Sequence, residues 1–105
     1  MVEIIWTEPA LEDINEIAEY IALENPVPAK TLVKDIFASA NRLKDFPESG
    51  RKPPELDDSR YREFIVGPCR VFYRLHGEKL FILYVMRSER ALRNFLIEDR
   101  DGSGS

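Results

Sequence analysis

Residues 70–87, with the sequence RVFYRLHGEKLFILYVMR, constrain the fold of this chain more than any other stretch. Two runs rich in β-branched and aromatic residues flank His76 and Gly77, and a glycine at such a position supplies the positive φ that a tight hairpin needs. The stretch therefore predicts two antiparallel strands, over residues 70–75 and 80–87, joined by a short turn. Arginines interrupt both runs, so their positions decide which face of the hairpin can be buried.

Side chains alternate between the two faces of a strand, so Arg70, Phe72 and Arg74 share one face, here called the arginine face. If the hairpin loop has an even number of residues, the second strand adds to this face Lys79, Phe81, Leu83, Val85 and Arg87. The opposite face then carries only apolar and aromatic side chains: Val71, Tyr73, Leu75, Leu80, Ile82, Tyr84 and Met86. We expect the apolar face to pack on helices. The arginine face should be open to water or to a partner, because burying an unpaired guanidinium is very costly.

An alternative applies to the same arginines. On a one-sided antiparallel sheet they can simply be solvated residues, paired with acidic neighbours: Glu63, Glu78 or Glu89. The apolar side chains beside them (Phe72, Phe81 and Leu83) favour a patch that a partner covers. Arg62 is undecided between the faces. A two-residue turn at Gly67-Pro68 places it on the helix side, and a three-residue turn places it with Arg70.

The rest of the chain supplies helices and two more strands. VEIIW at residues 2–6 predicts a short strand. Apolar residues at helical spacing predict amphipathic helices over residues 8–23 and 28–45, separated by ENPVP. A polar, proline-rich loop follows, and residues 61–66 predict a strand that leads into the hairpin. The order predicts an α+β fold in which an N-terminal strand, a helical hairpin and a three-stranded antiparallel meander form one small sheet with helices on one face.

The C-terminal residues carry two further expectations. SERALRNFL, residues 88–96, is typical of a short closing helix with Ser88 as its cap. Residues 1–97 then form a single domain, in keeping with a chain of 105 residues. Residues 98–105 are expected to form a disordered tail, whose GSGS end has the composition of an engineered linker.

Composition and charge limit the classes of function. The longest apolar run is too short to span a bilayer, no signal peptide is evident, and Cys69 is the single cysteine, so we expect a cytoplasmic protein without a membrane partner. The net charge is −4, but residues 1–59 carry 13 acidic and 6 basic side chains, whereas residues 60–105 carry 6 and 9. A dedicated nucleic-acid binder usually has an overall basic excess, which this chain lacks.

Three other features invite chemistry and are expected to be structural. His76 sits at the predicted hairpin tip, away from the arginine face, and is expected to be a turn residue. Cys69 has no histidine partner or helix N-terminus by sequence, so a half-buried structural thiol is expected. The acidic residues of the first helix have no histidine or cysteine at ligand spacing, so we expect no metal.

Four stretches of sequence carry a family resemblance: WTEPALEDINEIAEYI, FPESGRKPPEL, YREFIVGPCRVFYRL and ILYVMRSERALRNFL. Together they resemble the RelE/ParE toxin superfamily of bacterial type II toxin–antitoxin systems, over residues 2–97. The resemblance implies an antiparallel sheet with a helical hairpin on one side and a cytoplasmic location. It also implies a cognate antitoxin, which folds across the surface of the toxin in a hetero-oligomer.

The superfamily has two activities, and the resemblance bears on both. Relatives of the RelE type cut mRNA within the ribosome with basic residues and no metal, whereas relatives of the ParE type poison DNA gyrase. For a nuclease, the matching candidates are Arg62, Arg70 and Arg87, with Arg70 at the phosphate-binding position. Phe64 occupies the second basic position of the middle strand. The C-terminal tyrosine and the histidine at the end of the last strand have no match, and arginine is a poor general base because it stays protonated.

We therefore expect a ParE-like toxin that binds a target such as DNA gyrase, needs no cofactor and is neutralised by an antitoxin. Two alternatives stay open: a ribosome-dependent mRNA endonuclease of the RelE type, and an inactive member that only binds antitoxin and regulates its own operon. Whether the chain is an enzyme is left open, with the ParE-like interpretation favouring that it is not. The residues expected to bind the target or the antitoxin are Arg70, Phe72, Arg74, Phe81, Leu83, Arg87 and Arg90.

Overall fold

The computed structural model describes residues 1–56 and 60–104. Along the chain it contains β1 (Glu3–Trp6), α1 (Glu8–Ala22), α2 (Pro26–Asn41), the short 3₁₀ helix η1 (Arg42–Lys44), β2 (Tyr61–Val66), β3 (Cys69–His76), β4 (Lys79–Arg87) and α3 (Asn94–Gly104). The strands form one sheet in the order β1-β4-β3-β2, in which β1 runs parallel to β4 and the other strands form an antiparallel meander. The predicted α+β fold and element order are confirmed.

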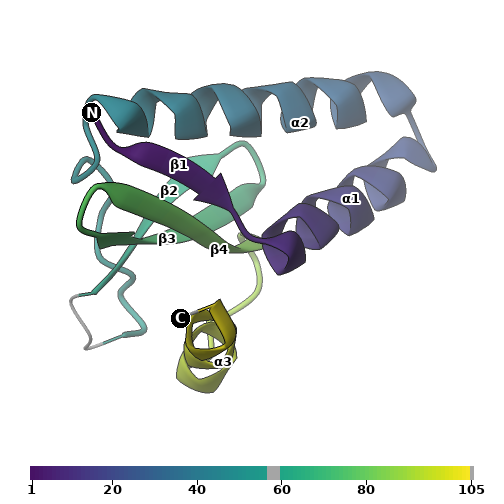
Figure 1. The fold of residues 1–105 in the computed structure, drawn as a ribbon. Coiled ribbons are helices and arrows are strands. Elements are labelled where there is room, and N and C mark those ends of the chain that lie inside the picture. Colours follow the sequence, from purple (N-terminus) through teal and green to yellow (C-terminus); the bar gives the residue numbers. More distant parts are fainter. Residues whose placement is uncertain (57–59, 105) are drawn as a thin grey trace.

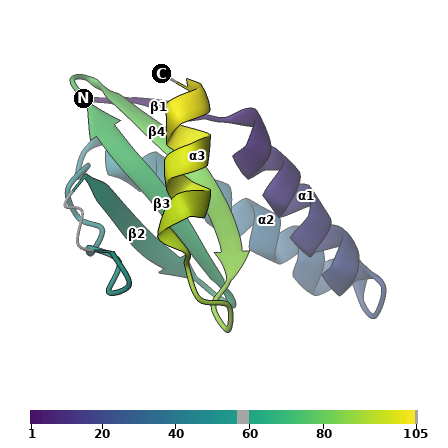
Figure 2. The ribbon, with the colours of Figure 1, turned by 90° about the horizontal axis from the view of Figure 1, so that it is seen from below.

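The molecule has three layers. Figure 1 shows α1 and α2 on one face of the sheet and α3 on the other. The view from below places α3 across the strands on the face away from the helical hairpin (Figure 2). The expectation that the helices pack on one face of the sheet therefore holds for α1 and α2, but not for α3. No helix in the described part of the chain is both long and apolar enough to cross a membrane.

The helical hairpin begins where the sequence supplies helix-start residues. Pro9 lies in the first turn of α1, and Pro26 opens α2, where a missing backbone N–H costs little. Asn25 caps α2, because its side-chain oxygen accepts a hydrogen bond from the backbone N of Val27 at 3.0 Å. The inner faces of both helices then pack on the sheet and form the first core, with Ala10, Ile14, Leu32, Ile36, Ala40, Val71, Tyr73, Leu80 and Ile82.

A second core lies on the face that was expected to be open. It contains Leu56, Tyr61, Phe72, Leu83, Tyr84, Met86, Leu92 and Ile97. Phe72 and Leu83 are only 0% and 1% exposed. The expectation of an exposed apolar patch on the arginine face is therefore wrong, because α3 and the segment before β2 cover these side chains. α3 also begins later than expected, and it continues through residues that were expected to form a disordered tail.

A β-bulge in β4 changes which residues share a face. Phe72 pairs with Tyr84 and Tyr73 pairs with Ile82, so Leu83 is an extra residue without a partner in the register. Up to Leu83 the predicted alternation is confirmed. Beyond it, Tyr84 and Met86 pack in the second core, whereas Val85 packs in the first. Placing Val85 and Arg87 on the arginine face was therefore wrong, because an inserted residue shifts the alternation by one.

Both turns of the meander have two residues. Val66 pairs with Cys69 around Gly67-Pro68, and His76 pairs with Lys79. Gly67 and Gly77 have φ values of 52° and 62°, in the left-handed region that favours glycine. The even hairpin loop is confirmed, and His76 is an exposed residue at the turn, as expected. Of the two positions left open for Arg62, the turn selects the helix side, where Arg62 pairs with Tyr73.

Candidate functional site

Arg70 is buried on the arginine face, with 6% of its surface exposed. Its Nε donates to Glu63 Oε1 at 2.8 Å, and its Nη2 donates to Glu63 Oε2 at 3.0 Å and to Glu55 Oε1 at 2.6 Å. Its Nη1 donates to Glu55 Oε2 at 2.6 Å and to the backbone oxygen of Arg90 at 3.4 Å. A guanidinium has five N–H donors, and all five have acceptors within the protein. Arg70 therefore has no donor left for a phosphate.

The two carboxylates around Arg70 are themselves held by other groups. Glu63 is fully buried and also lies 3.3 Å from Arg51 Nε. Glu55 accepts a further hydrogen bond from the backbone N of Leu92 at 3.1 Å. The hydrogen bonds that Arg70 donates lower the pKa of the Glu55 carboxyl to about 2. Hydrogen bonding to Glu55 and Glu63 in turn raises the pKa of the Arg70 guanidinium. This network joins β2 and β3 to the segment before β2 and to the residues that lead into α3.

Two more arginines connect α3 to the rest of the molecule. Arg74 Nε lies 2.9 Å from Asp101 Oδ1 and forms an ion pair with it. The Nε–H does not point at this oxygen well enough to form a hydrogen bond. Tyr61 donates its hydroxyl to the other oxygen of Asp101 at 3.0 Å. Arg100 forms an ion pair with Asp13 of α1 and lies 3.8 Å above the ring centre of Tyr84. These contacts hold α3 against the sheet and engage Arg74 within the molecule.

The remaining predicted arginines are distributed over other surfaces. Arg62 Nη1 donates to the backbone oxygens of Glu48 and Gly50 at 3.1 and 2.8 Å. Arg87 is partly exposed, pairs with Glu89 at 2.6 Å and lies 5.5 Å from the ring centre of Tyr20 in α1. The three nuclease candidates therefore do not share one face. The alternative pairing partners Glu63 and Glu89 are confirmed, but the pair at Arg70 is buried rather than solvated.

Cys69 and two residues of the expected binding face, Phe81 and Arg90, differ in burial. Cys69 is fully buried, beyond the half-burial expected, and burial raises the pKa of its thiol. Arg90 is exposed, and Phe81 is partly buried against the second core. Across residues 1–56 and 60–104 there is no group of three or more histidine, cysteine, aspartate or glutamate side chains placed to hold a metal ion.

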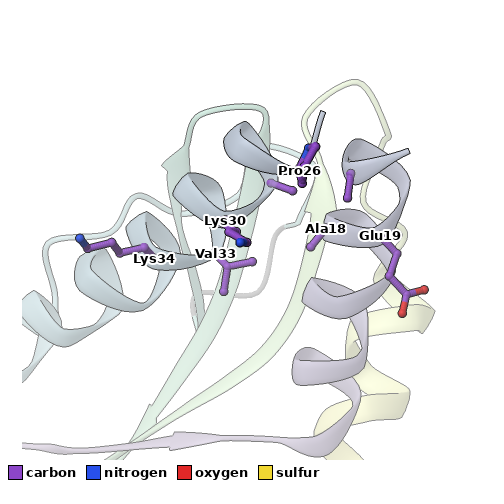
Figure 3. Close-up of a pocket in the computed structure, with 8 residues that line it drawn as sticks. Ala18, Glu19, Pro26, Lys30, Val33 and Lys34 are labelled. Atoms are coloured by element: carbon purple, nitrogen blue, oxygen red, sulfur yellow. The ribbon is translucent and has the colours of Figure 1, made fainter. Parts of the chain in front are cut away.

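A groove between α1 and α2 was not predicted from the sequence. It has a volume of about 450 Å³ and is lined by Ala18, Glu19, Ala22, Pro26, Ala29, Lys30, Val33 and Lys34 (Figure 3). Ala18 and Ala22 each follow a residue of α1 that packs against the first core, so they lie on the flank of the helix. A signal was present in the sequence, because Ala18 and Ala22 lie at i, i+4 spacing, but such spacing does not distinguish the flank of a helix from the face that packs on the sheet.

Exposed apolar side chains continue from the groove around the end of the hairpin. Tyr20, Leu23 and Val27 are all exposed, although they lie in or beside helices. Tyr20 and Leu23 line a second hollow of about 330 Å³ with Arg87. Exposed aromatic and aliphatic groups around a groove are typical of a protein-binding surface. The geometry therefore points to the helical hairpin, rather than the arginine face, as the open interaction surface.

Comparison with known proteins agrees with this fold. The chain matches the family described as ParE toxin of type II toxin-antitoxin system, parDE, over residues 4–92. Toxin RelE2 of Caulobacter vibrioides is 30% identical over 95 residues, which cover 89% of this chain and 99% of that protein. Toxin ParE3 of the same organism is 32% identical over 87 residues, covering 82% and 86%.

A solved structure gives the same answer for the fold. The chromosomal ParDE toxin–antitoxin system from P. aeruginosa contains a chain that superposes with a TM-score of 0.70 and 26% identity, over 85% of this chain and 98% of that one. The resemblance seen in the sequence is therefore confirmed. This chain belongs to the ParE toxin family of type II toxin–antitoxin systems.

Proposed function

We propose that this toxin arrests growth by binding a protein target, with DNA gyrase as the first candidate, and that it does not cut RNA. The observation that carries the proposal is the state of Arg70. Its position matches the phosphate-binding arginine of the nuclease branch, yet every N–H of its guanidinium already has an acceptor. Binding a phosphate there would require breaking at least one of two bidentate ion pairs, in one of which the carboxylate is fully buried.

The other groups that RNA cleavage requires are also poorly placed. Cleavage through a 2′-hydroxyl needs a base, an acid and a free cation near one phosphate. Phe64 occupies the second basic position and cannot transfer a proton. His76 lies at the exposed turn between β3 and β4. Arg87, at the end of β4, lies beside Tyr20 of α1. Binding to a protein requires none of these groups, and it suits a surface with exposed apolar side chains.

Neutralisation by a cognate antitoxin is part of the same proposal. The antitoxin needs an open apolar surface to cover, and the groove between α1 and α2 is such a surface. Of the residues first expected to bind it, Phe72 and Leu83 are buried, whereas Arg87 and Arg90 remain accessible. We therefore place the antitoxin on the helical hairpin, close to Arg87.

The test is a pair of assays on the purified chain. We expect the toxin to inhibit supercoiling by gyrase or to trap its cleavage complex, and to leave mRNA intact on translating ribosomes. Expression without the neighbouring antitoxin gene should arrest growth, and His76→Ala, at the exposed turn, should arrest it equally. Discrete mRNA cuts with unaffected gyrase would overturn the proposal.

A second candidate is supported by a specific observation. Toxin RelE2 is 30% identical to this chain over nearly its whole length, and its name places it with the RelE group. Ribosome-dependent mRNA cleavage is therefore the alternative outcome of the same two assays. An absence of growth arrest would favour the third possibility, an inactive member that only binds antitoxin.

A further inference from the structure

The two edges of the sheet differ in how they are covered. The strand order is β1-β4-β3-β2, so β1 and β2 each have one side without a neighbouring strand among the described residues. At β2 this side is partly covered, because Arg51 forms a bridge with Glu63. Along β1, which Figure 1 shows beneath α2, the described residues form no such bridge. An open edge of this kind is a template for pairing with another strand.

The open part of this edge consists of the backbone groups of Ile4 and Trp6. The backbone N of Glu3 donates to the turn before β4 at 2.8 Å, and that of Thr7 donates to β4 at 3.2 Å. Odd-numbered residues of β1 therefore direct their N–H groups towards β4. Because successive residues of a strand direct these groups to opposite sides, Ile4 and Trp6 direct theirs outward.

Opposite charges lie at the two ends of the open edge. At one end, the backbone N of Val2 donates to the backbone oxygen of Lys44 at 3.3 Å, which closes the edge there and places Lys44 beside it. At the other end, Glu8 is the exposed first residue of α1. Neither Lys44 nor Glu8 has an ion pair with another described residue. The edge therefore has a basic end and an acidic end.

A partly apolar hollow of about 470 Å³ lies beside the edge, and it is lined by Ile4, Trp6, Phe37, Ala38, Asn41 and Lys44. The ring centre of Phe37 lies 4.7 Å from that of Trp6, and Phe37 is 39% exposed. Ala38 is exposed and small, so another helix can approach α2 closely at this point. The surface thus suits a partner that brings both a strand and a helix above that strand.

We propose that this surface binds a second copy of the chain, with the two β1 strands paired antiparallel so that the two sheets become one. When Ile4 of each copy pairs with the partner's Trp6, the outward N–H and C=O groups of both residues all find partners. Ile5 then lies opposite the partner's Ile5 at the two-fold axis. Pairing Ile4 with the partner's Ile4 would instead place Trp6 opposite Val2, whose N–H is already used.

The same register brings the opposite charges together. It places Val2, and with it Lys44, next to the partner's Glu8, and the two-fold axis repeats the contact at the other end. A parallel pairing would place Lys44 near Lys44 and Glu8 near Glu8, where like charges repel. The two α2 helices lie on the same side of the joined sheet, so each contributes apolar side chains to the hollow of the other. The edge is therefore complementary to itself in backbone groups, charge and apolar surface.

The experiment uses Trp6 as a reporter, because it is the only tryptophan of the chain and lies at the proposed contact. Purified full-length toxin is studied by sedimentation equilibrium and by fluorescence from low to high micromolar concentration. We expect the mass to rise from 12.2 kDa to twice that value. Over the same range the emission of Trp6 should shift to shorter wavelength, because pairing removes its indole from water.

Two results of this experiment would overturn the proposal. One is a mass that stays at 12.2 kDa at every concentration. The other is a mass that doubles while the emission of Trp6 stays constant, because the copies would then meet at another surface. A monomer whose Trp6 emission changes only when antitoxin is added would assign the edge to that protein, and this result counts against the proposal as well.

An exchange of charges tests the antiparallel register. Lys44→Glu and Glu8→Lys should each weaken the dimer by roughly tenfold in Kd, because the dimer contains the contact twice. The double variant carries the same pair reversed and should recover the affinity of the parent chain. Glu24→Lys, in the turn between α1 and α2, is the matched control and should leave the affinity unchanged. Losses that add up in the double variant would contradict the register.

A bulky side chain tests whether the two α2 helices lie side by side. Ala38→Arg should abolish the dimer, because the new side chain fills the hollow, and it should keep the fold, because arginine is a good helix former at an exposed position. Glu16→Arg, on the exposed surface of α1, is the matched control. A dimer that tolerates Ala38→Arg would overturn the proposed arrangement. Gyrase inhibition and growth arrest do not enter these measurements, so their outcome is independent of the proposed target.

Discussion

The arginine face and the helical groove both combine charged side chains with apolar neighbours, but they use the charges in opposite ways. On the arginine face, Arg70 and Arg74 are paired with carboxylates from the segment before β2, from β2 and from α3. In the groove, Glu19 and Lys34 face water. The first region holds the fold together, and the second is free to bind. Charge beside apolar residues therefore indicates a binding surface only where the protein has not already supplied the counter-ion.

The largest expected effect is that of Arg70→Ala on stability. The substitution leaves Glu63 buried without its main cation, which costs about 3–5 kcal/mol in the free energy of unfolding. Urea denaturation measures this loss. Arg87→Ala is the matched control, because it removes an arginine from an exposed pair, and we expect a much smaller loss. Equal losses in the two variants would contradict the distinction between buried and exposed ion pairs.

Gly50→Ala should have the next largest effect. A Cβ at Gly50 would lie 2.5 Å from Tyr73 Oη and 2.8 Å from the backbone oxygen of Glu63. Relieving this overlap moves the segment that accepts the hydrogen bond from Arg62, so we expect a loss of about 1–3 kcal/mol. Thermal unfolding tests it against Gly102→Ala, where the added Cβ meets nothing within 4 Å. A Gly50→Ala variant as stable as the parent chain would show that the segment is not held by this contact.

Measuring the stability of the protein as a function of pH tests the network around Arg70. Folding lowers the pKa of Glu55 from 4.5 to about 2, because the carboxylate is bound to Arg70. Its contribution is complete above about pH 4.5 and is lost as the pH falls toward 2. Glu55→Gln should cost roughly 1 kcal/mol at pH 7 and should flatten the stability profile between these values. A profile that keeps its slope in the variant would assign the acid sensitivity to other carboxylates.

Lys34→Glu should have the smallest effect on stability and a clear effect on binding. Lys34 has no ion pair with a described residue, so we expect a change within about 0.5 kcal/mol in the free energy of unfolding. Affinity for the antitoxin should fall, because the variant reverses a charge at the groove in which the antitoxin is proposed to bind. Calorimetric titration measures the affinity, with Lys52→Glu as a control charge reversal. A strongly destabilised Lys34→Glu would mean that this charge, too, is used internally.

Most of the fold could be predicted from local patterns. Alternation in β3 and the first half of β4, the two-residue turns at Gly67 and Gly77, and the proline breaks around α1 and α2 all depend on neighbours in the sequence. The bulge at Leu83 could not be predicted, because an alternating apolar run reads equally well with or without an inserted residue. Arg87 was misplaced for this reason alone.

The candidate site was harder to predict because its contacts are non-local. Glu55 and Arg70 are 15 residues apart, and Asp13 and Arg100 are 87 apart. No regular spacing in the sequence links such pairs. Because residues 98–105 were expected to be disordered, contacts from Arg100 and Asp101 to the rest of the fold were not predicted. The groove depends on which flank of each helix faces the other, and a helical stripe of apolar residues does not distinguish this flank from the face on the sheet.

The amino-acid pattern was thus sufficient for the α+β order, the family and the presence of arginines on one face of β3, because these follow from periodicity and short motifs. Whether those arginines bind a partner or hold the protein together was settled by folding, which brings Glu55, Glu63 and Asp101 to them from distant segments. The physical reason is that the cost of burying a guanidinium depends on its counter-ions, and the chain positions of those counter-ions are fixed only in three dimensions.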